Sequence, residues 1–527
     1  MVSPSAIPSI EGWEQWMPHP DAVQTLPYIV TAILVVIGVM TFGSSKSNSN
    51  IPMLNPVKSF SLTYTDAKKI FTSSSRKLLE QGKALYSGKA YRMITDLGEV
   101  TILPSSVADE IRNEPKMDFT KATYIDLHGK IPGFQGLALD IIDSAALVHV
   151  ARKQLTKSLA KVTETLSEEA TIAFSTNLGD STEWKKIHAK PAVLDIISRI
   201  SSRVFLGDEL CRNEEWLRIT KSYTVTVFTA AAKLRLFPAV IQAVVHWFVP
   251  ECQQLRALHA RAREIITPVI EKRKQIKKEA VAKGESIPKF NDAIEWFEEE
   301  AKKPNYDPAN FQLCLSVVAI HTSSDLMQQV ILDLAENPQF IEPIREEIVK
   351  VLRAEGWKKT ALYNMKLLDS AIKESQRRKP IGLTSMRRFV TDDITLSNGV
   401  SLKYGDRVVV DSTNMWDSKK YENPLAYNPY RFLEMRSKPE TENMALLVAT
   451  SAGHLGFGHG EHSCPGRFFA ANEIKIALCH MLIKYEWKLA PGSSTEPNVN
   501  GLDLSANLEA ELLVRRRQNM EIDIDSI

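Results

Sequence analysis

A single cysteine lies in the glycine-rich stretch FGHGEHSCPGRFFA, residues 457–470, directly before a strongly helical pattern. Gly458 and Gly460 permit positive φ and a close approach of the backbone to another group. Pro465 suits the first turn of a helix that we expect to continue through GRFFAANEIKIALCHMLIKYEW. Cys464 would then precede a helix N-terminus, where free N–H groups and the helix dipole favour a thiolate, which is a nucleophile or a metal ligand.

Other roles for Cys464 place different demands on the sequence. A small buried cysteine needs only apolar surroundings, whereas the glycines here clear space beside the loop and His462 adds a polar ring two residues before the sulfur. A cysteine protease needs a partner histidine, and no local signature of one is present. The five cysteines are scattered and include no CxxC pair, which argues against a disulfide scaffold or structural zinc and favours a reducing compartment.

The overall charge gives no reason to expect one class of partner. Lys and Arg number 65 and Asp and Glu 63, so the formal net charge is +2, and we expect no nucleic-acid partner. Hydrophobic residues make up 44% and charged residues 24%, which is the balance of a folded globular protein. No break in composition divides the soluble part, so we expect one large globular domain.

Residues 22–45 carry no charged side chain and include the apolar run LPYIVTAILVVIGVMTF. A helix needs about 20 predominantly apolar residues to span a bilayer. A cleaved signal peptide begins with Lys or Arg residues, but the first Lys or Arg here is Lys46, after the segment. Positive charge on that side indicates that the rest of the chain faces the cytosol. A buried core helix is the alternative. The predicted organisation is a lumenal N-terminus (1–21), a transmembrane anchor (22–45), a linker with a proline hinge (46–60) and a globular domain (61–527).

The globular part is predicted to be mainly helical, with small sheets near both ends. AYRMITDLGEVTILP predicts a hairpin near Ala90–Leu103, and RRFVTDDITLSNGVSLKYGDRVVVDS predicts strands within Arg387–Ser412. Helical patterns dominate from Ser105 to about Gln376. The lysine-rich helix REIITPVIEKRKQIKKEAVAK has a basic face typical of a solvated surface, with partner docking as the alternative.

One long helix is predicted over Pro308–Ala335. Asp307 can cap its first N–H groups, Pro308 suits its first turn, and Asn337–Pro338 ends it. At about 1.5 Å per residue it is about 42 Å long. Its centre, AIHTSS at 319–324, places polar side chains in an otherwise apolar helix. Hydroxyls that bond back to carbonyls one turn earlier would account for them.

Glu374 and Arg377 lie three residues apart on a predicted helix and therefore share a face. Most such pairs are surface ion pairs that contribute a fraction of a kcal/mol. Arg431 lies between two aromatic residues in YNPYRF, where its planar fork can bridge a carboxylate and backbone carbonyls. The alternatives are a surface pair and a buried Glu374–Arg377–Arg431 cluster.

The cysteine stretch resembles the haem-ligand signature of the cytochrome P-450 family, Phe-x-x-Gly-x-x-x-Cys-x-Gly. AIHTSS resembles the oxygen-groove segment of the family's long helix, Glu374-x-x-Arg377 matches its Glu-x-x-Arg element, and YNPYRF resembles its aromatic-x-Pro-x-Arg-Phe element. The four occur in the family's order, the N-terminal anchor resembles the microsomal branch, and the resemblance covers essentially the whole chain. It implies a mainly α fold with small β-sheets. The matched signature positions are Phe457, Gly460, Cys464 and Gly466.

The resemblance implies haem b as the cofactor, with Cys464 as the axial thiolate on the iron, a ligand that favours O–O cleavage. Phe457 would pack on the porphyrin, and N–H groups after Cys464 would hydrogen-bond to the sulfur. His462 stands where the family usually has arginine and is expected to meet a haem propionate. The glycines implied in cofactor binding are Gly458, Gly460 and Gly466. The other basic candidates are Arg387, with Arg388 as a rival, and Arg152, with His149 and Lys153 as rivals.

Thr322 occupies the position of the groove threonine, and the resemblance implies that it orients the water that delivers protons to dioxygen. Many members have Asp or Glu before this threonine, whereas this chain has His321. Histidine can relay protons near neutral pH; alternatively, His321 shapes the helix kink and moves no proton. Glu374, Arg377 and Arg431 would hold the core beneath the haem without a redox role.

The segment Ser222–Pro250 is unusually apolar and falls where the family places the roof over the haem. It is expected to line the pocket or dip into the membrane, with ordinary helix packing as the alternative. A lipophilic small-molecule substrate follows. The AIHTSS variant resembles fungal members that act on terpenoids, namely ent-kaurene-oxidase-like and indole-diterpene enzymes. Other implied pocket residues are Val318, Ala319, Thr322, 381–386 and 501–506.

The leading expectation is a single-pass, monomeric monooxygenase of the endoplasmic reticulum membrane, with its catalytic domain facing the cytosol. Electrons would come from NADPH through a separate NADPH–cytochrome P-450 reductase, because the chain shows no flavin or nicotinamide fingerprint. One alternative is a reductase-independent haem-thiolate isomerase or dehydratase, which the missing acid at His321 favours slightly and Thr322 argues against. Others are oxidation of a fatty acid or steroid, and a non-catalytic haem-binding or sensing protein.

Overall fold

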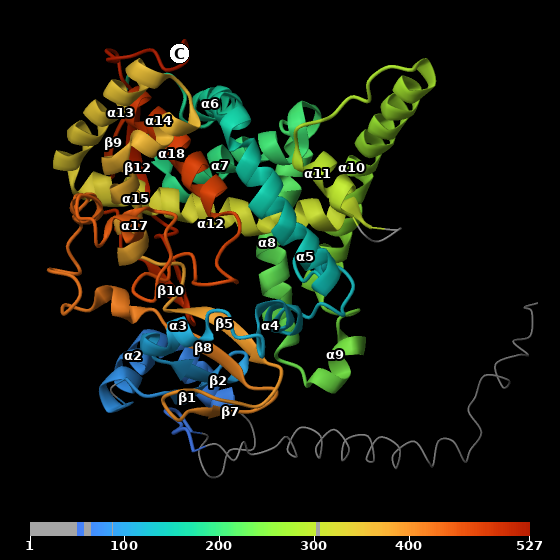
Figure 1. Ribbon diagram of the computed structural model, residues 1–527, viewed down its shortest axis with the longest axis vertical. Helices are drawn as coiled ribbons and strands as arrows, with labels where there is room; N and C mark the ends of the chain where they lie inside the picture. The colour runs from blue at the N-terminus through green and yellow to red at the C-terminus, as the bar shows by residue number, and fades with distance from the viewer. Residues whose placement is uncertain (1–49, 57–64, 87, 302–305) are drawn as a thin grey trace, which may run out of the picture.

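The computed structural model describes residues 50–56, 65–86, 88–301 and 306–527 (Figure 1). The predicted lumenal N-terminus, the transmembrane anchor and residues 46–49 and 57–60 of the predicted linker lie outside the described residues. Most of the chain forms a helical region, and a smaller region holds the main sheet with α2 (Thr65–Tyr86) beside it. The prediction of a mainly α fold with small sheets is confirmed.

The helices other than α2 follow in chain order. The first group is α3 (Ala108–Ile111), α4 (Phe119–Asp126), α5 (Ile141–His149), α6 (Thr156–Leu178), α7 (Ala189–Leu210), α8 (Glu214–Leu234), α9 (Ala239–Val245) and α10 (Pro250–Lys283). The second group is α11 (Ala293–Glu300), α12 (Pro308–Glu336), α13 (Ile341–Glu355), α14 (Lys359–Asn364), α15 (Lys366–Arg378), α16 (Arg431–Arg436), α17 (Glu442–Ala445) and α18 (Arg467–Lys484). A π-helical turn, Val150–Leu155, joins α5 to α6.

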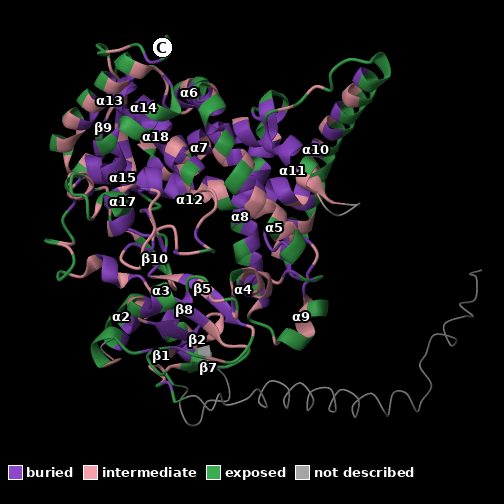
Figure 2. Cartoon of the chain, in the orientation of Figure 1, coloured by how far each residue is buried: buried purple, intermediate pink, exposed green. Residues whose placement is uncertain are grey.

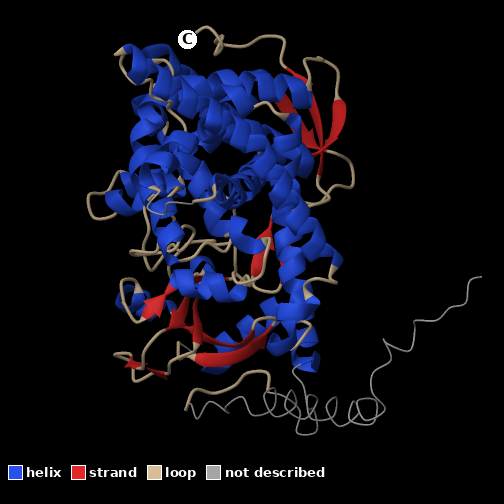
Figure 3. Ribbon diagram, turned by 90° about the vertical axis from the view of Figure 1, so that its right-hand side faces the viewer, coloured by secondary structure: helices blue, strands red, loops and turns tan. Residues whose placement is uncertain are grey.

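The main sheet has five strands in the order β1-β2-β8-β5-β3, and the predicted hairpin forms its β1–β2 edge. A three-stranded sheet, β4-β12-β9, lies at the opposite end of the molecule (Figure 3). Two-stranded sheets are formed by β6 with β7 and by β10 with β11. The strands are β1 (Tyr91–Thr95), β2 (Gly98–Leu103), β3 (Met117–Asp118), β4 (Lys185–His188), β5 (Thr384–Val390), β6 (Ile394–Thr395), β7 (Ser401–Leu402), β8 (Arg407–Asp411), β9 (Tyr485–Leu489), β10 (Asn498–Asn500), β11 (Asp503–Ser505) and β12 (Glu511–Arg516).

The proline-containing end of the predicted linker pairs with the main sheet. Arg92 of β1 donates its backbone N–H to the Pro52 carbonyl at 2.7 Å and accepts from the backbone N–H of Leu54 at 2.9 Å. The side-chain amide of Asn55 donates to the carbonyl of Ile94 at 3.0 Å. These bonds hold residues 52–55 against the first strand of the globular region.

Helix α12 is the central helix of the helical region, and its bounds confirm the predicted long helix to within one residue. The Asp307 side chain accepts from the backbone N–H of Ala309 at 3.0 Å, as the capping pattern predicts. At about 1.5 Å per residue, its 29 residues span about 43 Å. It packs against α7, α8, α10 and α15, and nearly its whole length is buried (Figure 2). It is therefore the rigid element from which a central site can be built.

Helix α18 differs from its predicted bounds at both ends. It begins at Arg467, with Gly466 as its N-cap, and ends at Lys484, whereas the prediction began it at Pro465 and continued it through Trp487. The stretch YEWKL instead forms β9, which pairs with β12 across a large sequence separation. Pairing with β12 therefore sets the end of this helix, and local helix propensity cannot predict such a distant contact.

Within the described residues, one helical stretch, Phe134–Leu178, is long and apolar enough to cross a membrane. Its α6 part packs against α7 and α18, and Leu166, Ala170 and Phe174 are fully buried there. Buried core helices meet the same length and composition criteria. This stretch is not the predicted anchor at residues 22–45.

Candidate active site

The loop that carries Cys464 is held in a tight shape by its own backbone. Gly458 and Gly460 adopt φ of +69° and +80°, and the backbone N–H of Cys464 donates to the carbonyl of Phe457 at 2.9 Å. A Cβ added at Gly460 would lie 2.5 Å from the carbonyl oxygen of Arg112. Glycine is therefore required there by both conformation and space.

Backbone donors and one cation lie near the Cys464 sulfur, but its burial works against a negative charge. Burial raises the pKa of the Cys464 thiol, while backbone N–H groups of Gly466 and Arg467 and the Arg467 charge act in the opposite direction. The effect of burial on the pKa is larger than that of the N–H groups at the start of α18. This differs from the expectation that the position before a helix favours a thiolate. A Cβ at Gly466 would meet no atom within 4 Å. Backbone donors on the sulfur and open space at Gly466, two residues after it, fit a thiolate that binds a metal within a flat cofactor.

A bulge in β5 gives the neighbouring residues Arg387 and Arg388 different environments. The strand has one extra residue between Ser385 and Arg388 relative to β8, and Met386 has a φ of 52°, a strained value for a non-glycine residue. Arg388 is 2% exposed, and its Nε and Nη2 have no hydrogen-bond partner. The Arg387 side chain is 39% exposed and lies 3.8 Å from the Asp126 carboxylate. Arg388 Nη1 donates to the Arg387 carbonyl at 2.8 Å, so the buried Arg388 guanidinium keeps two nitrogens without a partner, which fits an anionic group.

His462 lies near Arg388, and both side chains are affected by burial. Burial, followed by the charge of Arg388, lowers the pKa of His462. Burial likewise lowers the pKa of Arg388 to about 10, with Asp118 opposing it. The ring centroid of His462 is 6.2 Å from that of Phe119. Burial makes the charged form of both His462 and Arg388 costly. An anionic ligand bound beside them would offset that cost.

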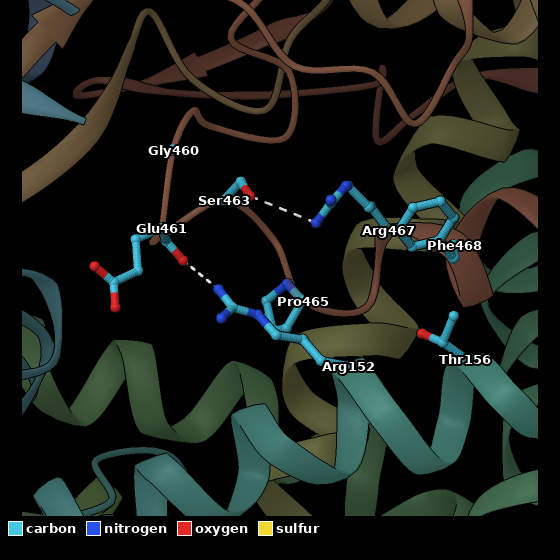
Figure 4. A pocket seen from close by; sticks show the side chains of 8 residues that line it. All are labelled: Arg152, Thr156, Gly460, Glu461, Ser463, Pro465, Arg467 and Phe468. Atoms are coloured by element: carbon cyan, nitrogen blue, oxygen red, sulfur yellow. Dashed lines mark hydrogen bonds between the residues drawn. The ribbon is translucent and has the colours of Figure 1, made fainter. Parts of the chain in front are cut away.

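Arg152 reaches the cysteine loop from the π-helical turn before α6 and donates to the carbonyl of Glu461 (Figure 4). The rival His149 is instead 3.0 Å from the Glu300 carboxylate. Arg152 and Lys153 are both exposed, but it is Arg152 that contacts the cysteine loop. A cavity of about 300 Å³ lies between Arg152 and the loop. Its lining residues are Arg152, Thr156, Gly460, Glu461, Ser463, Pro465, Arg467 and Phe468 (Figure 4).

Thr322 lies in the polar centre of α12. Val318 and Thr322, one turn apart, are the exposed residues of this helix between 309 and 334; Val318 is 44% exposed. The Thr322 hydroxyl donates to the Val318 carbonyl at 2.8 Å, which is the back-bonding expected for a hydroxyl within a helix. Its proton is committed to the helix, so its oxygen is available as an acceptor.

His321 lies toward α7 and α8, where it lines a groove of about 460 Å³. Burial, followed by the charge of Lys190, lowers the pKa of His321 to about 4, so the ring is neutral at pH 7. Its Nε2 is buried without a hydrogen-bond partner. The other groove residues are Leu194, Lys221, Ser222, Val225, Thr226, Thr229, Glu251 and Gln254.

Glu374, Arg377 and Arg431 are in direct contact. Arg377 donates to Glu374 through Nε at 2.8 Å and Nη2 at 2.9 Å, and Arg431 Nε donates to both carboxylate oxygens at 3.2 Å. Glu374 and Arg377 are 0% exposed, which excludes the surface ion-pair alternative. Arg377 also donates to the carbonyls of Met415 and Pro424 at 2.7 and 2.6 Å. The cluster therefore fastens the segment after β8 to α15.

Sequence reasoning missed three charged groups of this core: Arg467, Lys373 and Glu473. Glu473 of α18 is 0% exposed and accepts from the Ser201 hydroxyl; burial raises its pKa to about 8. Charged residues on a helix are usually solvated, so the sequence carried no signal for the burial of Lys373 or Glu473. For Arg467 the sequence did carry a signal, because this cation stands in the first helical turn after the cysteine loop.

Comparisons with known proteins agree with this geometry. A sequence model of the family described as Cytochrome P450 matches residues 140–513. Cytochrome P450 monooxygenase eqxH of Fusarium heterosporum is 47% identical, covering 91% of this chain and 92% of that protein. Cytochrome P450 monooxygenase hepE of Aspergillus oryzae is 44% identical over 92% of this chain and 89% of that protein. Cytochrome P450 monooxygenase TRI1 of Fusarium sporotrichioides is 40% identical over 93% and 90%.

A solved structure shares the fold. The retinoic acid-bound cyanobacterial CYP120A1 superposes with a TM-score of 0.62 over 89% of this chain and the whole of that one, at 16% identity. The family match covers most of the chain, and the fungal relatives are similar over nearly its full length. The chain therefore belongs to the cytochrome P450 family and is a haem-thiolate monooxygenase of the type found in these fungi.

Proposed function

We propose that this monooxygenase inserts one oxygen atom from dioxygen into a lipophilic, terpenoid-type small molecule, with electrons from NADPH delivered by a separate NADPH–cytochrome P-450 reductase. The observation that carries the proposal is the environment of Cys464. Two backbone N–H groups and the Arg467 charge oppose the effect of burial on this sulfur, as a metal-binding thiolate requires.

Cys464 would bind the iron of haem b, with Phe457 against the porphyrin. Arg388 takes the propionate role expected of Arg387, because Arg388 is buried with two unpaired nitrogens. A haem with a thiolate ligand supplies the activation of dioxygen for insertion into a C–H bond. The further residues of the proposed haem site are Arg152, His462, Gly458, Gly460 and Gly466.

Thr322 and His321 would deliver protons to dioxygen. The Thr322 oxygen accepts from a water, because its own proton is donated to Val318. His321 is neutral at pH 7 because its pKa is about 4, so the ring holds a proton only transiently at this pH. Its buried Nε2 has no hydrogen-bond partner and is the nitrogen that would pass a proton on. We propose that protons enter by the groove beside His321. A purely structural role for His321 would leave proton delivery unchanged in a variant that keeps the helix shape.

The roof segment supports a lipophilic substrate and contact with a membrane. Between α8 and α10, large apolar side chains are exposed; Leu236 is 78% and Phe248 76% exposed. Such a patch suits burial among lipid chains. With the uncharged segment 22–45 as anchor, we propose a single-pass monomer of the endoplasmic reticulum whose domain 61–527 faces the cytosol. The other exposed apolar residues of the patch are Phe237, Val240, Val244 and Trp247.

The test uses microsomes that contain the full-length protein, with and without the reductase, and a panel of terpenoids, fatty acids and steroids. The proposal predicts a terpenoid product one oxygen heavier, formed only with reductase and NADPH. His321, in place of an acid, favours one second candidate, a reductase-independent isomerase or dehydratase. Conversion without reductase would support that candidate and contradict the proposal, as would products from fatty acids or steroids alone.

A further inference from the structure

Lys373 is a buried lysine whose hydrogen bonds all go to one loop. It precedes Glu374 on α15 and is 0% exposed. Its Nζ donates to the carbonyl of Met444 at 2.7 Å and to that of Leu446 at 2.6 Å, with the Ala449 carbonyl at 3.5 Å. Three carbonyls of residues 444–449 thus meet the three N–H groups of one ammonium.

No carboxylate forms an ion pair with Lys373 in the described part of the chain. Asp369, one turn earlier on α15, raises its pKa, but burial dominates and lowers the pKa of Lys373 to about 7. Asp369 itself pairs with Lys475 at 2.6 Å and accepts the backbone N–H of Leu447 at 2.9 Å. A buried cation without a partner charge is costly. Lys373 and Asp369, one turn apart on α15, therefore bind the same loop: Lys373 donates to its carbonyls and Asp369 accepts from a backbone N–H group.

The same loop also binds Arg467. The Arg467 Nε donates to the carbonyl of Val448 at 3.1 Å. Its Nη1 donates to the Cys464 carbonyl at 2.9 Å. The same nitrogen is 3.4 Å from the Ser463 hydroxyl oxygen (Figure 4). The Arg467 guanidinium thus lies against the cysteine loop. Residues 444–449 therefore supply one of the contacts that place this guanidinium near the sulfur.

We propose that Lys373 is a positioning residue for Cys464: it fixes the loop 444–449, so that Val448 holds the Arg467 guanidinium beside the cysteine loop. The proposal rests on the assignment of Cys464 as the haem ligand. It is distinct from the Glu374–Arg377–Arg431 cluster, in which Arg377 holds the carbonyls of Met415 and Pro424. Lys373 acts on the segment that directly supports the ligand loop.

The test combines two variants of the holoenzyme. Lys373→Met keeps an apolar stem of similar length but removes the N–H donors, and Arg467→Gln removes the guanidinium that the loop holds. The readout is the share of the reduced carbon-monoxide complex that shows the long-wavelength band of thiolate ligation. Lys484→Met is the matched control, because Lys484 is 1% exposed on the same helix as Arg467 but pairs with Asp525.

We expect each of Lys373→Met and Arg467→Gln to lower the thiolate share, and the double variant to lower it no further than the larger single effect, because both act through one path. The control is expected to keep the band. Additive losses, or an equal loss in Lys484→Met, would overturn the proposal. Lys373→Gln, which keeps an amide donor, is a milder variant with a smaller expected loss.

Amide hydrogen exchange separates this proposal from the haem assignment. In Lys373→Met, exchange in residues 444–449 is expected to rise by roughly tenfold or more, because the carbonyl anchors are lost. Unchanged exchange would contradict the proposal whatever the spectrum shows. If the unmodified protein itself lacks the thiolate band, the assignment of Cys464 fails, and with it the positioning role.

Discussion

Replacing Glu374 by glutamine tests the buried ion cluster most sharply. Glu374 accepts two hydrogen bonds from Arg377 at 2.8 and 2.9 Å and lies within 3.2 Å of Arg431, with no exposed surface. The amide keeps the shape but removes the charge, which leaves two guanidinium groups in the interior without a counterion. Removing one partner of a buried pair costs about 3–5 kcal/mol. We expect Glu374→Gln to lose stability in this range.

The assay is urea unfolding followed by far-UV circular dichroism, with the change in free energy taken from the shift in midpoint at a common m-value. Glu271→Gln is the matched control, because Glu271 and Lys274 are also three residues apart, at 3.0 Å, but their side chains are 63% and 52% exposed. An exposed pair of this kind contributes at most about 0.5 kcal/mol. Equal losses in the two variants would refute the reasoning.

Three further predictions concern haem retention, coupling and pH dependence. Arg388→Gln should speed haem loss to an excess of a haem-scavenging globin by roughly tenfold, because a buried charge-assisted contact is removed, while the half-exposed Arg387→Gln should change it less; the reverse order would reject the Arg388 assignment. Thr322→Ala should raise peroxide release per NADPH consumed, because proton delivery is misdirected, and unchanged coupling would count against that role. Burial raises the pKa of Glu473 to about 8 from 4.5, so the native state binds the extra proton between these values and stability falls as pH rises, by up to about 1.4 kcal/mol per pH unit. Glu473→Gln should remove this slope in unfolding measured between about pH 5 and pH 8, and an unchanged slope would contradict it.

Helices and strands bounded by clear capping, proline or turn residues could be predicted from the sequence. The Asp307–Pro308 start and the Asn337–Pro338 end defined α12 to within one residue, because capping and proline chemistry act locally. The β1–β2 hairpin followed from alternation around its turn. For the site, recurrent motifs marked which residues matter, but their contact distances depend on a fold that brings Arg431 to Glu374.

The features that escaped prediction depend on long-range contacts. The bulge at Met386 decides which of two adjacent arginines is buried, and it exists only in the pairing of β5 with β8. The end of α18 at Lys484 depends on the pairing of β9 with β12. Glu473 follows an ordinary helical pattern, and its burial comes from packing on every side of α18.

The central claim is that the Cys464 sulfur is the haem ligand, and the spectrum of the reduced carbon-monoxide complex tests it most directly. Cys479→Ser is the control, because Cys479 is fully buried in α18 beside Met365. The account predicts that Cys464→Ser abolishes the long-wavelength thiolate band and that Cys479→Ser retains it. A Cys464→Ser protein that keeps the band would contradict the account.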